Sequence, residues 1–273
     1  MKKIVFLFLA VMMLFTGCAA PDKAPVKDPV NTLSSPTDIM PTGTPETKPI
    51  LTGWVEQAGK YYYFLEDGTL ATGKHVIDGK ECCFGTDGAQ IILVNPWNYK
   101  PEGYDPPLVS IGGGKYVHAM CYDDLMDMLD ACLEAGHTYN IDYAYRSFQL
   151  QTRLYLGAVD SYLKAGFSRK MAGKQAGKAT AVPGTSEHEL GLALDIVDKD
   201  HPGRNSAQAN TDTQKWLMAN SWKYGFILRY PNGKTDITGI IYEPWHYRYV
   251  GKEIAAEIFE SGMCLEEYLA AMQ

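Results

Sequence analysis

Two short stretches of the sequence combine the residue types that bind a divalent metal ion and activate water. The first stretch, GTSEHELGLALD, contains His188 and Asp195, and the second, YEPWHYR, contains Glu243 and His246. Two imidazoles and one carboxylate are a typical ligand set for catalytic zinc, which keeps a fourth position for water. Each residue type alone is more often a core, surface or capping residue, and the sequence has no HEXXH motif. The prediction of a zinc site at His188, Asp195 and His246 therefore depends on their joint occurrence.

The surroundings of two carboxylates add to this prediction. Asp195 follows the apolar residues Leu192–Leu194 in a segment expected to be a buried strand. An unpaired carboxylate is costly to bury, and a bound cation offsets that cost. Glu243 lies three residues before His246, so an extended or turn-like segment can present both side chains to one site. Glu243 is then placed to take a proton from the attacking water and to pass it to a leaving amine.

The elements expected around these residues give an α+β fold from about residue 93 to residue 273. Apolar residues at helical spacing predict helices, and short apolar or alternating runs predict strands. Helices are expected at 123–135, 149–165, 211–224 and 252–272, strands at 140–146, 191–197, 226–230 and 240–242, and a polar loop at 166–184. This order predicts a mixed or antiparallel sheet with packed helices and a zinc site.

An internal repeat precedes this part of the chain, at residues 51–92. The pattern TGWV, GK, F and DG between Thr52 and Gly68 recurs as TGKH, GK, F and DG between Thr72 and Gly88. Each copy has two short runs joined by a Gly turn, which predicts a small module of two β-hairpins. The repeats resemble the cell-wall-binding (choline-binding-type) repeats of Gram-positive surface proteins, which bind quaternary amines in aromatic cages. Because Lys74 replaces the Trp of the first copy, a wall-binding module and a structural spacer both remain open.

The N-terminus has the features of a secretory signal. Two lysines precede an apolar run at 4–15, which is followed by Thr-Gly and then Cys18. The run is too short to cross a membrane as a helix, and the small residues before the cysteine resemble a bacterial lipoprotein cleavage site. We expect residues 1–18 to be a lipoprotein signal peptide with lipidation at Cys18; the alternative is an ordinary secreted protein. Residues 19–50, rich in Pro, Thr and Ser, are expected to form a disordered tether.

Composition and charge limit the kinds of partner. The formal net charge is −7, hydrophobic residues make up 46% and charged residues 21%, and the sequence has no Arg-rich run. These values exclude a general nucleic-acid binder and disfavour electrostatic adhesion to anionic lipids. Attachment to the membrane is therefore expected through the lipid anchor alone. Five cysteines follow Cys18, an odd number without zinc-finger spacing, and they predict no particular disulfide.

From Leu93 to the C-terminus, the sequence resembles the VanY-type D-alanyl-D-alanine carboxypeptidases, within the superfamily that contains lysostaphin, D-Ala-D-Ala peptidases and hedgehog. Four blocks carry the resemblance, in the family's order and spacing: YRS from Tyr145 with Gln151, SxHxxGxAxD from Ser186, GFILRYP from Gly225 and EPWHYRYVG from Glu243. The resemblance implies a hedgehog/D-Ala-D-Ala peptidase-like fold in which His188, Asp195 and His246 bind Zn²⁺. It also implies that Glu243 is the catalytic base.

The same resemblance suggests roles for four polar residues. Arg146 would lie opposite the metal and stabilise the oxyanion on the scissile carbonyl, with a structural salt bridge as the alternative. Ser186 and Gln151 would form hydrogen bonds to the substrate. Arg229 would recognise the terminal carboxylate of the substrate, or equally form an ion pair that supports the sheet.

The implied activity is that of a zinc metallopeptidase that removes the C-terminal D-alanine from peptidoglycan stem peptides. The alternatives are an LD-carboxypeptidase acting on tetrapeptide stems, an endopeptidase of the same superfamily, and a non-catalytic wall-binding lipoprotein. A non-catalytic scaffold would be expected to lose Glu243 or a ligand, and none is lost. The predicted location is the outer face of the cell membrane, associated with the wall, where residues 51–92 would contact wall polysaccharide or teichoic acid.

Overall fold

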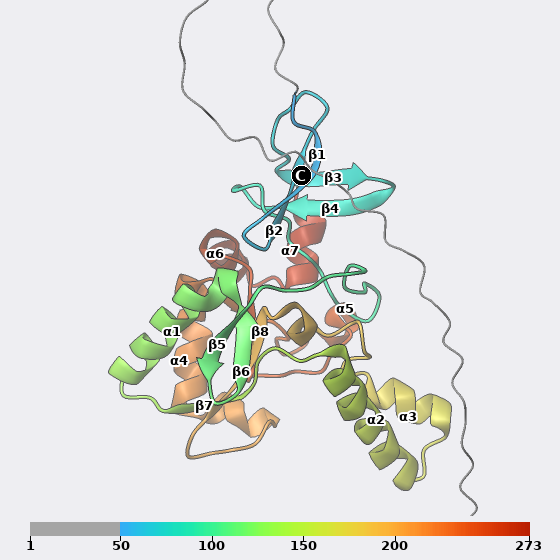
Figure 1. Ribbon diagram of the computed structural model, residues 1–273. Coiled ribbons are helices and arrows are strands. Elements are labelled where there is room, and N and C mark those ends of the chain that lie inside the picture. The colour runs from blue at the N-terminus through green and yellow to red at the C-terminus, as the bar shows by residue number, and fades with distance from the viewer. Residues whose placement is uncertain (1–49) are drawn as a thin grey trace, which may run out of the picture. The chain divides into compact units, whose positions relative to one another are not determined.

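The computed structural model describes residues 50–273 (Figure 1). The predicted signal peptide, Cys18 and nearly all of the predicted tether at 19–50 lie outside these residues. Within the described range, no helix combines the length and the apolar character needed to cross a membrane.

The two repeats each fold as an antiparallel β-hairpin, as predicted. The first pairs β1 (Gly53–Gln57) with β2 (Lys60–Phe64), and the second pairs β3 (Gly73–Ile77) with β4 (Lys80–Phe84). Both connections are two-residue turns, and all four of their residues have positive φ, 52° and 75° in Ala58-Gly59 and 51° and 73° in Asp78-Gly79. This backbone is that of a type I′ turn, whose twist matches the twist of the paired strands.

The hairpins make contacts with the rest of residues 49–273, which form one compact unit. Cys83 of β4 belongs to the same apolar cluster as Ile254 and Leu265 of the C-terminal helices. The backbone N–H of Lys74 donates to the carbonyl of Gln273 over 3.0 Å. The side chain of Lys74 donates to the carbonyl of Ala270 over 3.2 Å. The second hairpin is therefore held by both apolar and polar contacts.

The central sheet has four antiparallel strands in the order β7-β8-β10-β9. These are β7 (Tyr139–Tyr143), β8 (Ala193–Asp198), β10 (His246–Tyr249) and β9 (Phe226–Leu228). Every residue of β8 and β10 is buried, so the two middle strands form the centre of the fold. A separate hairpin joins β5 (Leu108–Gly112) to β6 (Lys115–His118). The predicted α+β class with an antiparallel sheet is confirmed.

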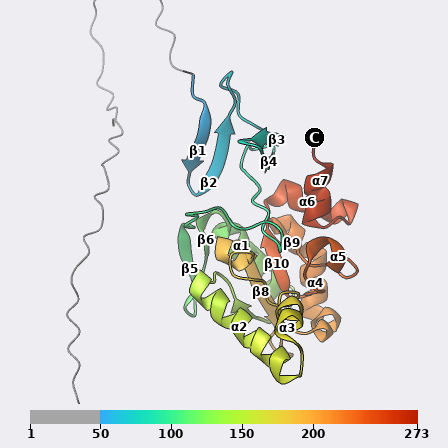
Figure 2. The same ribbon diagram turned by 90° about the vertical axis from the view of Figure 1, so that its right-hand side faces the viewer.

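Helices cover the sheet and extend from it. Buried residues of α1 (Tyr122–Glu134) and α4 (Asp212–Asn220) share the main apolar cluster with β8 and β10. Helices α2 (Phe148–Lys164) and α3 (Arg169–Ala176) lie side by side as a helical hairpin in both views (Figures 1 and 2). The remaining helices are α5 (Thr235–Thr238), α6 (Lys252–Ser261) and α7 (Leu265–Ala271).

The structure corrects several element predictions. The segment 166–184, predicted to be a loop, contains α3, whose buried face consists of the small residues Ala172 and Ala176. The segment 240–242, predicted to be a strand, is irregular, and Ile241 donates its backbone N–H to Lys178 rather than to a strand. The α-helix predicted over 211–224 ends at Asn220 and continues as a 3-10 turn to Tyr224. The strands β5, β6 and β10 were not predicted.

Candidate metal centre and active site

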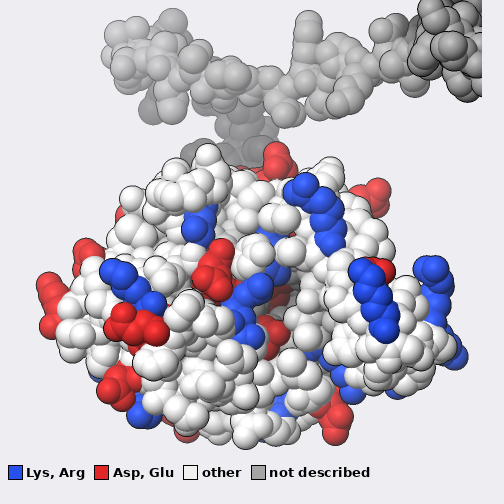
Figure 3. Space-filling model, turned by 90° about the horizontal axis from the view of Figure 1, so that it is seen from below, with Lys and Arg blue, Asp and Glu red and all other residues white. Residues whose placement is uncertain are grey.

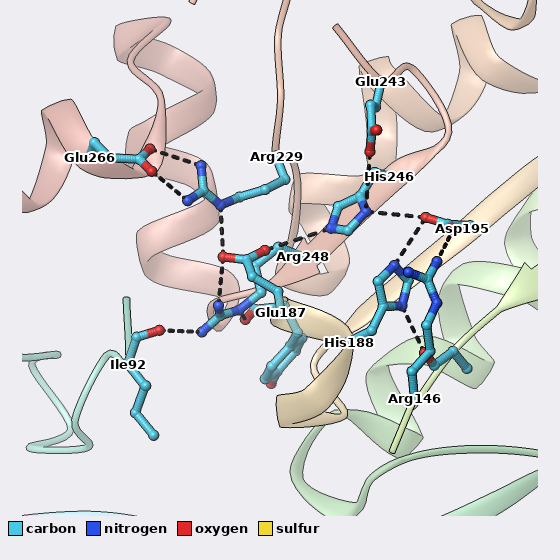
Figure 4. Close-up of polar contacts among 12 residues, drawn as sticks. Ile92, Arg146, Glu187, His188, Asp195, Arg229, Glu243, His246, Arg248 and Glu266 are labelled. Atoms are coloured by element: carbon cyan, nitrogen blue, oxygen red, sulfur yellow. Dashed lines mark hydrogen bonds and ion pairs between the residues drawn. The ribbon is translucent and has the colours of Figure 1, made fainter. Parts of the chain in front are cut away.

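Three chain segments bring the predicted metal ligands together. Asp195 on β8 lies directly opposite His246 on β10 in the antiparallel register. His188 comes from the 3-10 turn Glu187–Leu190, which ends at Gly191 with a left-handed φ of 72° and leads into β8. One ligand atom from each of the three residues lies within 4.8 Å of the others. All three side chains are buried, and Figure 4 shows them pointing toward one another.

The two imidazoles meet the same oxygen of Asp195. Nε2 of His188 is 3.2 Å and Nδ1 of His246 is 3.1 Å from Oδ1 of Asp195. Ligand atoms bound at ~2.0–2.1 Å to a tetrahedral zinc ion lie about 3.3 Å apart, so this spacing fits zinc. Nε2 of His188 is buried and forms no hydrogen bond within the described chain, which leaves its lone pair for an ion.

Partners behind each imidazole set which nitrogen faces the site. Nδ1 of His188 is 2.7 Å from the carbonyl of Ala144 and donates to it, which leaves Nε2 as the ligand atom. His246 is turned the other way: Nδ1 faces Asp195, while Nε2 is 3.7 Å from Oε2 of Glu187. Such a partner on the far nitrogen is the usual way in which proteins orient a metal-binding histidine.

The charges of the site suit a cation. Burial, with the charge of Arg146, lowers the pKa of His188 to about 4, so its imidazole is neutral as a ligand must be. Burial alone would raise the pKa of Asp195, but His188 and Arg146 hold it well below its usual range. Burial opposes protonation of His246, yet the hydrogen bond to Asp195 and the nearby carboxylate of Glu187 raise its pKa to about 9. A metal ion at this position takes the place of that proton.

Glu243 reaches the same site from the turn before β10. The backbone N–H of His246 donates to the carbonyl of Glu243, which closes the predicted turn between the two residues. Oε2 of Glu243 is 3.6 Å from Nδ1 of His246. Burial raises the pKa of the Glu243 carboxyl to about 8, against the opposing charge of His246. A carboxylate with so high a proton affinity is suited to general base catalysis.

Arg146 is fixed beside Asp195 in the short segment between β7 and α2. Its Nη2 donates to Oδ2 of Asp195 over 2.6 Å, and its Nη1 donates to Oε1 of Gln151 over 3.2 Å. Gln151 in turn donates from Nε2 to the carbonyl of Ala181 over 2.7 Å and is fully buried. Gln151 therefore positions Arg146, and its role in binding the substrate stays a prediction.

A cavity of about 280 Å³ opens onto these groups. Figure 3 shows acidic and basic side chains together in the hollow on this face. Ser186 lies in its wall, where a substrate-binding role was predicted for it. The full lining includes Arg146, Leu154, Ala179, Thr180, Ala181, Ser186, His188, Asp195, Arg204, Tyr230, Ile240, Ile241, Glu243, Trp245 and His246.

Arg229 is not in this cavity, which corrects its predicted substrate-binding role. Its side chain has no exposed surface, and its guanidinium is occupied by two carboxylates. Nε donates to Glu187 over 2.8 Å, and Nη2 donates to Glu266 over 2.6 Å. Arg248 adds a second guanidinium 2.8 Å from the same oxygen of Glu187. The structure thus contains the ion pair that was the alternative for Arg229 (Figure 4).

Sequence reasoning missed three residues of the site. Glu187, between Ser186 and His188, faces Nε2 of His246. In the sequence, only its position inside the first motif could have indicated this role. The ring of Tyr230 lies 4.7 Å from that of His246, centroid to centroid, within the GFILRYP block. Arg204 lines the cavity from a polar loop, where no motif or periodicity marks it.

Comparisons with known proteins agree with this geometry. Residues 114–252 match the family model "VanY: D-alanyl-D-alanine carboxypeptidase". A D-alanyl-D-alanine carboxypeptidase of Enterococcus faecalis is 40% identical over 205 residues, which cover 75% of this chain and 72% of the relative.

Two solved structures are also similar. A vancomycin-resistance D,D-pentapeptidase VanY from a VanB-type cassette, solved in complex with Zn(II), is 40% identical with a TM-score of 0.60. That match covers 65% of this chain and 97% of the other. The LdcB LD-carboxypeptidase is 35% identical with a TM-score of 0.58 and covers 72% of this chain and 92% of its own. The family model and the E. faecalis relative together show that this chain belongs to the VanY family of D-alanyl-D-alanine carboxypeptidases.

Proposed function

We propose that the protein is a zinc-dependent DD-carboxypeptidase that hydrolyses the C-terminal D-alanine from peptidoglycan stem peptides. One observation carries this proposal: Asp195 presents one oxygen to two imidazoles and the other to Arg146, inside a cavity that also contains Glu243. A metal-dependent hydrolytic site brings a metal, a base and an oxyanion donor within reach of one bond. These residues supply the three positions.

His188, Asp195 and His246 are the residues that would hold zinc. The ion would supply Lewis acidity, which polarises the scissile carbonyl and makes water acidic enough to be deprotonated near neutral pH. The surrounding protein keeps the three ligands in place, because Ala144 fixes His188, Glu187 faces His246 and Arg146 holds Asp195.

Glu243 acts as the proton carrier. Its carboxylate takes the proton of the attacking water and holds it on one oxygen until the amide nitrogen leaves. It then donates that proton to the departing amine, so that free D-alanine leaves and the base is regenerated. Burial favours this role because it raises the proton affinity of the carboxyl.

Arg146 donates hydrogen bonds to the oxygen on which negative charge develops. Its side chain is already held by Asp195 and Gln151, so little reorganisation is needed during the reaction. A preorganised donor of this kind contributes about 10²- to 10³-fold to kcat.

The test is D-alanine release from a synthetic pentapeptide stem by the zinc-loaded protein. Glu243→Gln should retain zinc and lose about 10²- to 10⁴-fold in kcat. Glu260→Gln, an exposed glutamate on α6, is the matched control and should behave as the wild type. A fully active Glu243→Gln variant would falsify the assigned base.

The LD-carboxypeptidase alternative has one observation in its favour. The solved LdcB LD-carboxypeptidase is 35% identical to this chain, close to the 40% of the D,D-pentapeptidase. Pentapeptide and tetrapeptide stems compared in the same assay separate the two activities. Release of alanine from the tetrapeptide alone would replace the DD assignment by the LD assignment.

We further propose that the protein is an exported lipoprotein on the outer face of the membrane, anchored through Cys18. The support is the sequence pattern of lysines, apolar run and Thr-Gly-Cys. Labelling with a clickable palmitate analogue tests it: the wild type should carry the label, and Cys18→Ser should not. A labelled Cys18→Ser protein would contradict the anchor.

We propose that the first repeat contacts wall polysaccharide or teichoic acid, while the second serves as a spacer. Trp54 is 43% exposed and packs edge-on against Tyr63 at 5.1 Å, which offers an aromatic surface to a ligand. At the corresponding place of the second repeat, Lys74 instead binds the carbonyl of Ala270. Trp54→Ala should reduce retention on purified cell walls, whereas Val76→Ala, also exposed, should not.

A further inference from the structure

A carboxypeptidase must recognise a terminal carboxylate, and the structure offers a cation for it in place of the buried Arg229. Arg204 lies in the loop after β8 and lines the same cavity as the metal ligands. Its side chain is 36% exposed, whereas that of Arg146 is only 7% exposed. Of these two arginines, Arg204 is therefore the more accessible to an entering ligand.

Arg204 and Arg146 both contact the carboxylate of Asp195 and the ring of Tyr143. Nη1 of Arg204 is 3.2 Å from Oδ2 of Asp195, the oxygen that also accepts from Arg146. The guanidinium carbons of Arg204 and Arg146 lie 4.5 Å and 4.3 Å from the centroid of the Tyr143 ring. Nε of Arg204 is 3.6 Å from Asp142. These contacts hold the guanidinium at the cavity wall.

The contacts of Arg204 leave part of its donor fork unused. Within residues 50–273, no hydrogen bond or ion pair involves its Nη2. In Arg146, by comparison, both Nη groups have partners, Asp195 and Gln151, and the buried Nε has none within the described residues. A planar guanidinium with a free Nη2 at a cavity wall is suited to a carboxylate.

Spacing also favours a carboxylate one residue away from the scissile bond. Consecutive Cα atoms are about 3.8 Å apart, so the terminal carboxylate of a substrate lies within one residue of the carbonyl under attack. Arg146 and Arg204 contact one oxygen of Asp195 and thus present their guanidiniums at neighbouring positions. One can then serve the developing oxyanion and the other the terminal carboxylate.

We propose that Arg204 binds the C-terminal carboxylate of the stem peptide and thereby restricts this enzyme to exopeptidase cleavage. The inference rests on the proposed carboxypeptidase activity and adds the residue that selects a free chain end. It holds for DD and LD cleavage alike, because both substrates end in a D-alanine carboxylate.

Two pentapeptide stems that differ only at the C-terminus, as free acid or as amide, test the proposal. The wild type should cleave the acid with a kcat/KM about 10- to 100-fold above that of the amide, as expected for a hydrogen-bonded charge pair. In Arg204→Gln, the ratio of acid to amide should fall toward one, chiefly through a higher KM for the acid. Arg204→Lys, which keeps the charge, should show an intermediate ratio. Arg169→Gln, on the exposed start of α3, is the control and should keep the wild-type ratio.

Bound zinc and the circular dichroism spectrum of each variant separate this role from a structural one. If Arg204→Gln lowers cleavage of acid and amide equally, or releases zinc, Arg204 acts on Asp195 and the proposal is overturned. It is also overturned if the wild type cleaves the amide as fast as the acid. If the zinc-loaded wild type cleaves neither peptide, the carboxypeptidase assignment itself fails, and that outcome is distinct from a lost preference.

Discussion

Two carboxylates in this protein are each held by two guanidiniums, and the two clusters differ in their access to solvent. Glu187 lies between Arg229 and Arg248, and all three side chains are almost without exposed surface. Asp195 is equally buried, but its two partners, Arg146 and Arg204, line the cavity, and the Arg204 side chain is 36% exposed. The same residue types thus form a closed support in one place and an open site in the other.

The difference shows why charged residue types alone do not identify a binding site. In the closed cluster, Arg229 also binds Glu266, and the carboxylates occupy its donors. In the open cluster, Asp195 also faces His188 and His246, and Nη2 of Arg204 has no partner within residues 50–273. The two clusters meet at His246, whose two ring nitrogens face Asp195 and Glu187.

The largest expected effect comes from removing one arginine of the closed cluster, which consists of Glu187, Arg229 and Arg248. Arg229→Met leaves the buried Glu187 and the partly buried Glu266 without that counter-charge, and breaking a buried pair lowers the free energy of unfolding by about 3–5 kcal/mol. Urea unfolding of the metal-free protein measures this loss, with the exposed Arg169→Met on α3 as control. A loss below about 1 kcal/mol, the value of a surface pair, would remove the contrast between the clusters.

A change in the open cluster should affect the reaction more than the fold. Arg146→Lys keeps a positive charge beside Asp195 but loses the double contact with Asp195 and Gln151. We expect kcat to fall by about 10²- to 10³-fold, as for the loss of one oxyanion donor. Steady-state kinetics and urea unfolding are measured on the same preparation. If stability falls as much as in Arg229→Met, Arg146 is a structural residue.

Glu187 connects the two clusters and should increase the affinity of the site for zinc. Glu187→Gln keeps the side-chain shape but removes the negative charge behind Nε2 of His246. Loss of such a partner weakens metal binding by about 10- to 100-fold. Competition with a chelator gives the zinc affinity, and Glu260→Gln again serves as control. Unchanged affinity would show that Glu187 supports only Arg229 and Arg248.

His118 provides a comparison with a buried group that has no carboxylate partner within residues 50–273. It is fully buried, its Nδ1 accepts from the N–H of Met120, and burial lowers its pKa to about 4. Because the unfolded chain binds this proton more tightly, stability should fall as the pH drops from ~6.5 to ~4, by up to about 1.4 kcal/mol per pH unit.

His118→Asn keeps an acceptor for Met120 and removes the titration. Urea unfolding of the metal-free wild type and variant at pH 6.5, 5.5 and 4.5 should show a shallower acid loss in the variant. Parallel curves would show that His118 keeps an ordinary pKa in the folded protein.

The sequence predicts best what depends on local pattern. The hairpins of the repeats, α1 and the buried strand around Asp195 follow from turn residues and apolar spacing. The meeting of the metal ligands was predicted because two separate motifs together contain the two histidines and the aspartate of a zinc site. Helix α3 was missed because its buried face is made of alanines, which carry little hydrophobic signal.

The sequence could not show where each arginine side chain points. Arg146, Arg204 and Arg229 have the same chemistry, and only the tertiary contacts decide which faces a cavity and which faces Glu187. Gln151 was assigned to the substrate, because a sequence does not show that its amide is already bonded to Ala181 and Arg146.

The pairing of Asp195 with His246 across β8 and β10 also makes zinc binding depend on the register of these two strands. If the two strands slipped by one residue, the side chains would point to opposite faces and the ligands would separate. Only the correctly paired chain could then gain the free energy of metal binding. Zinc binding therefore selects the native register of β8 and β10 over a slipped one.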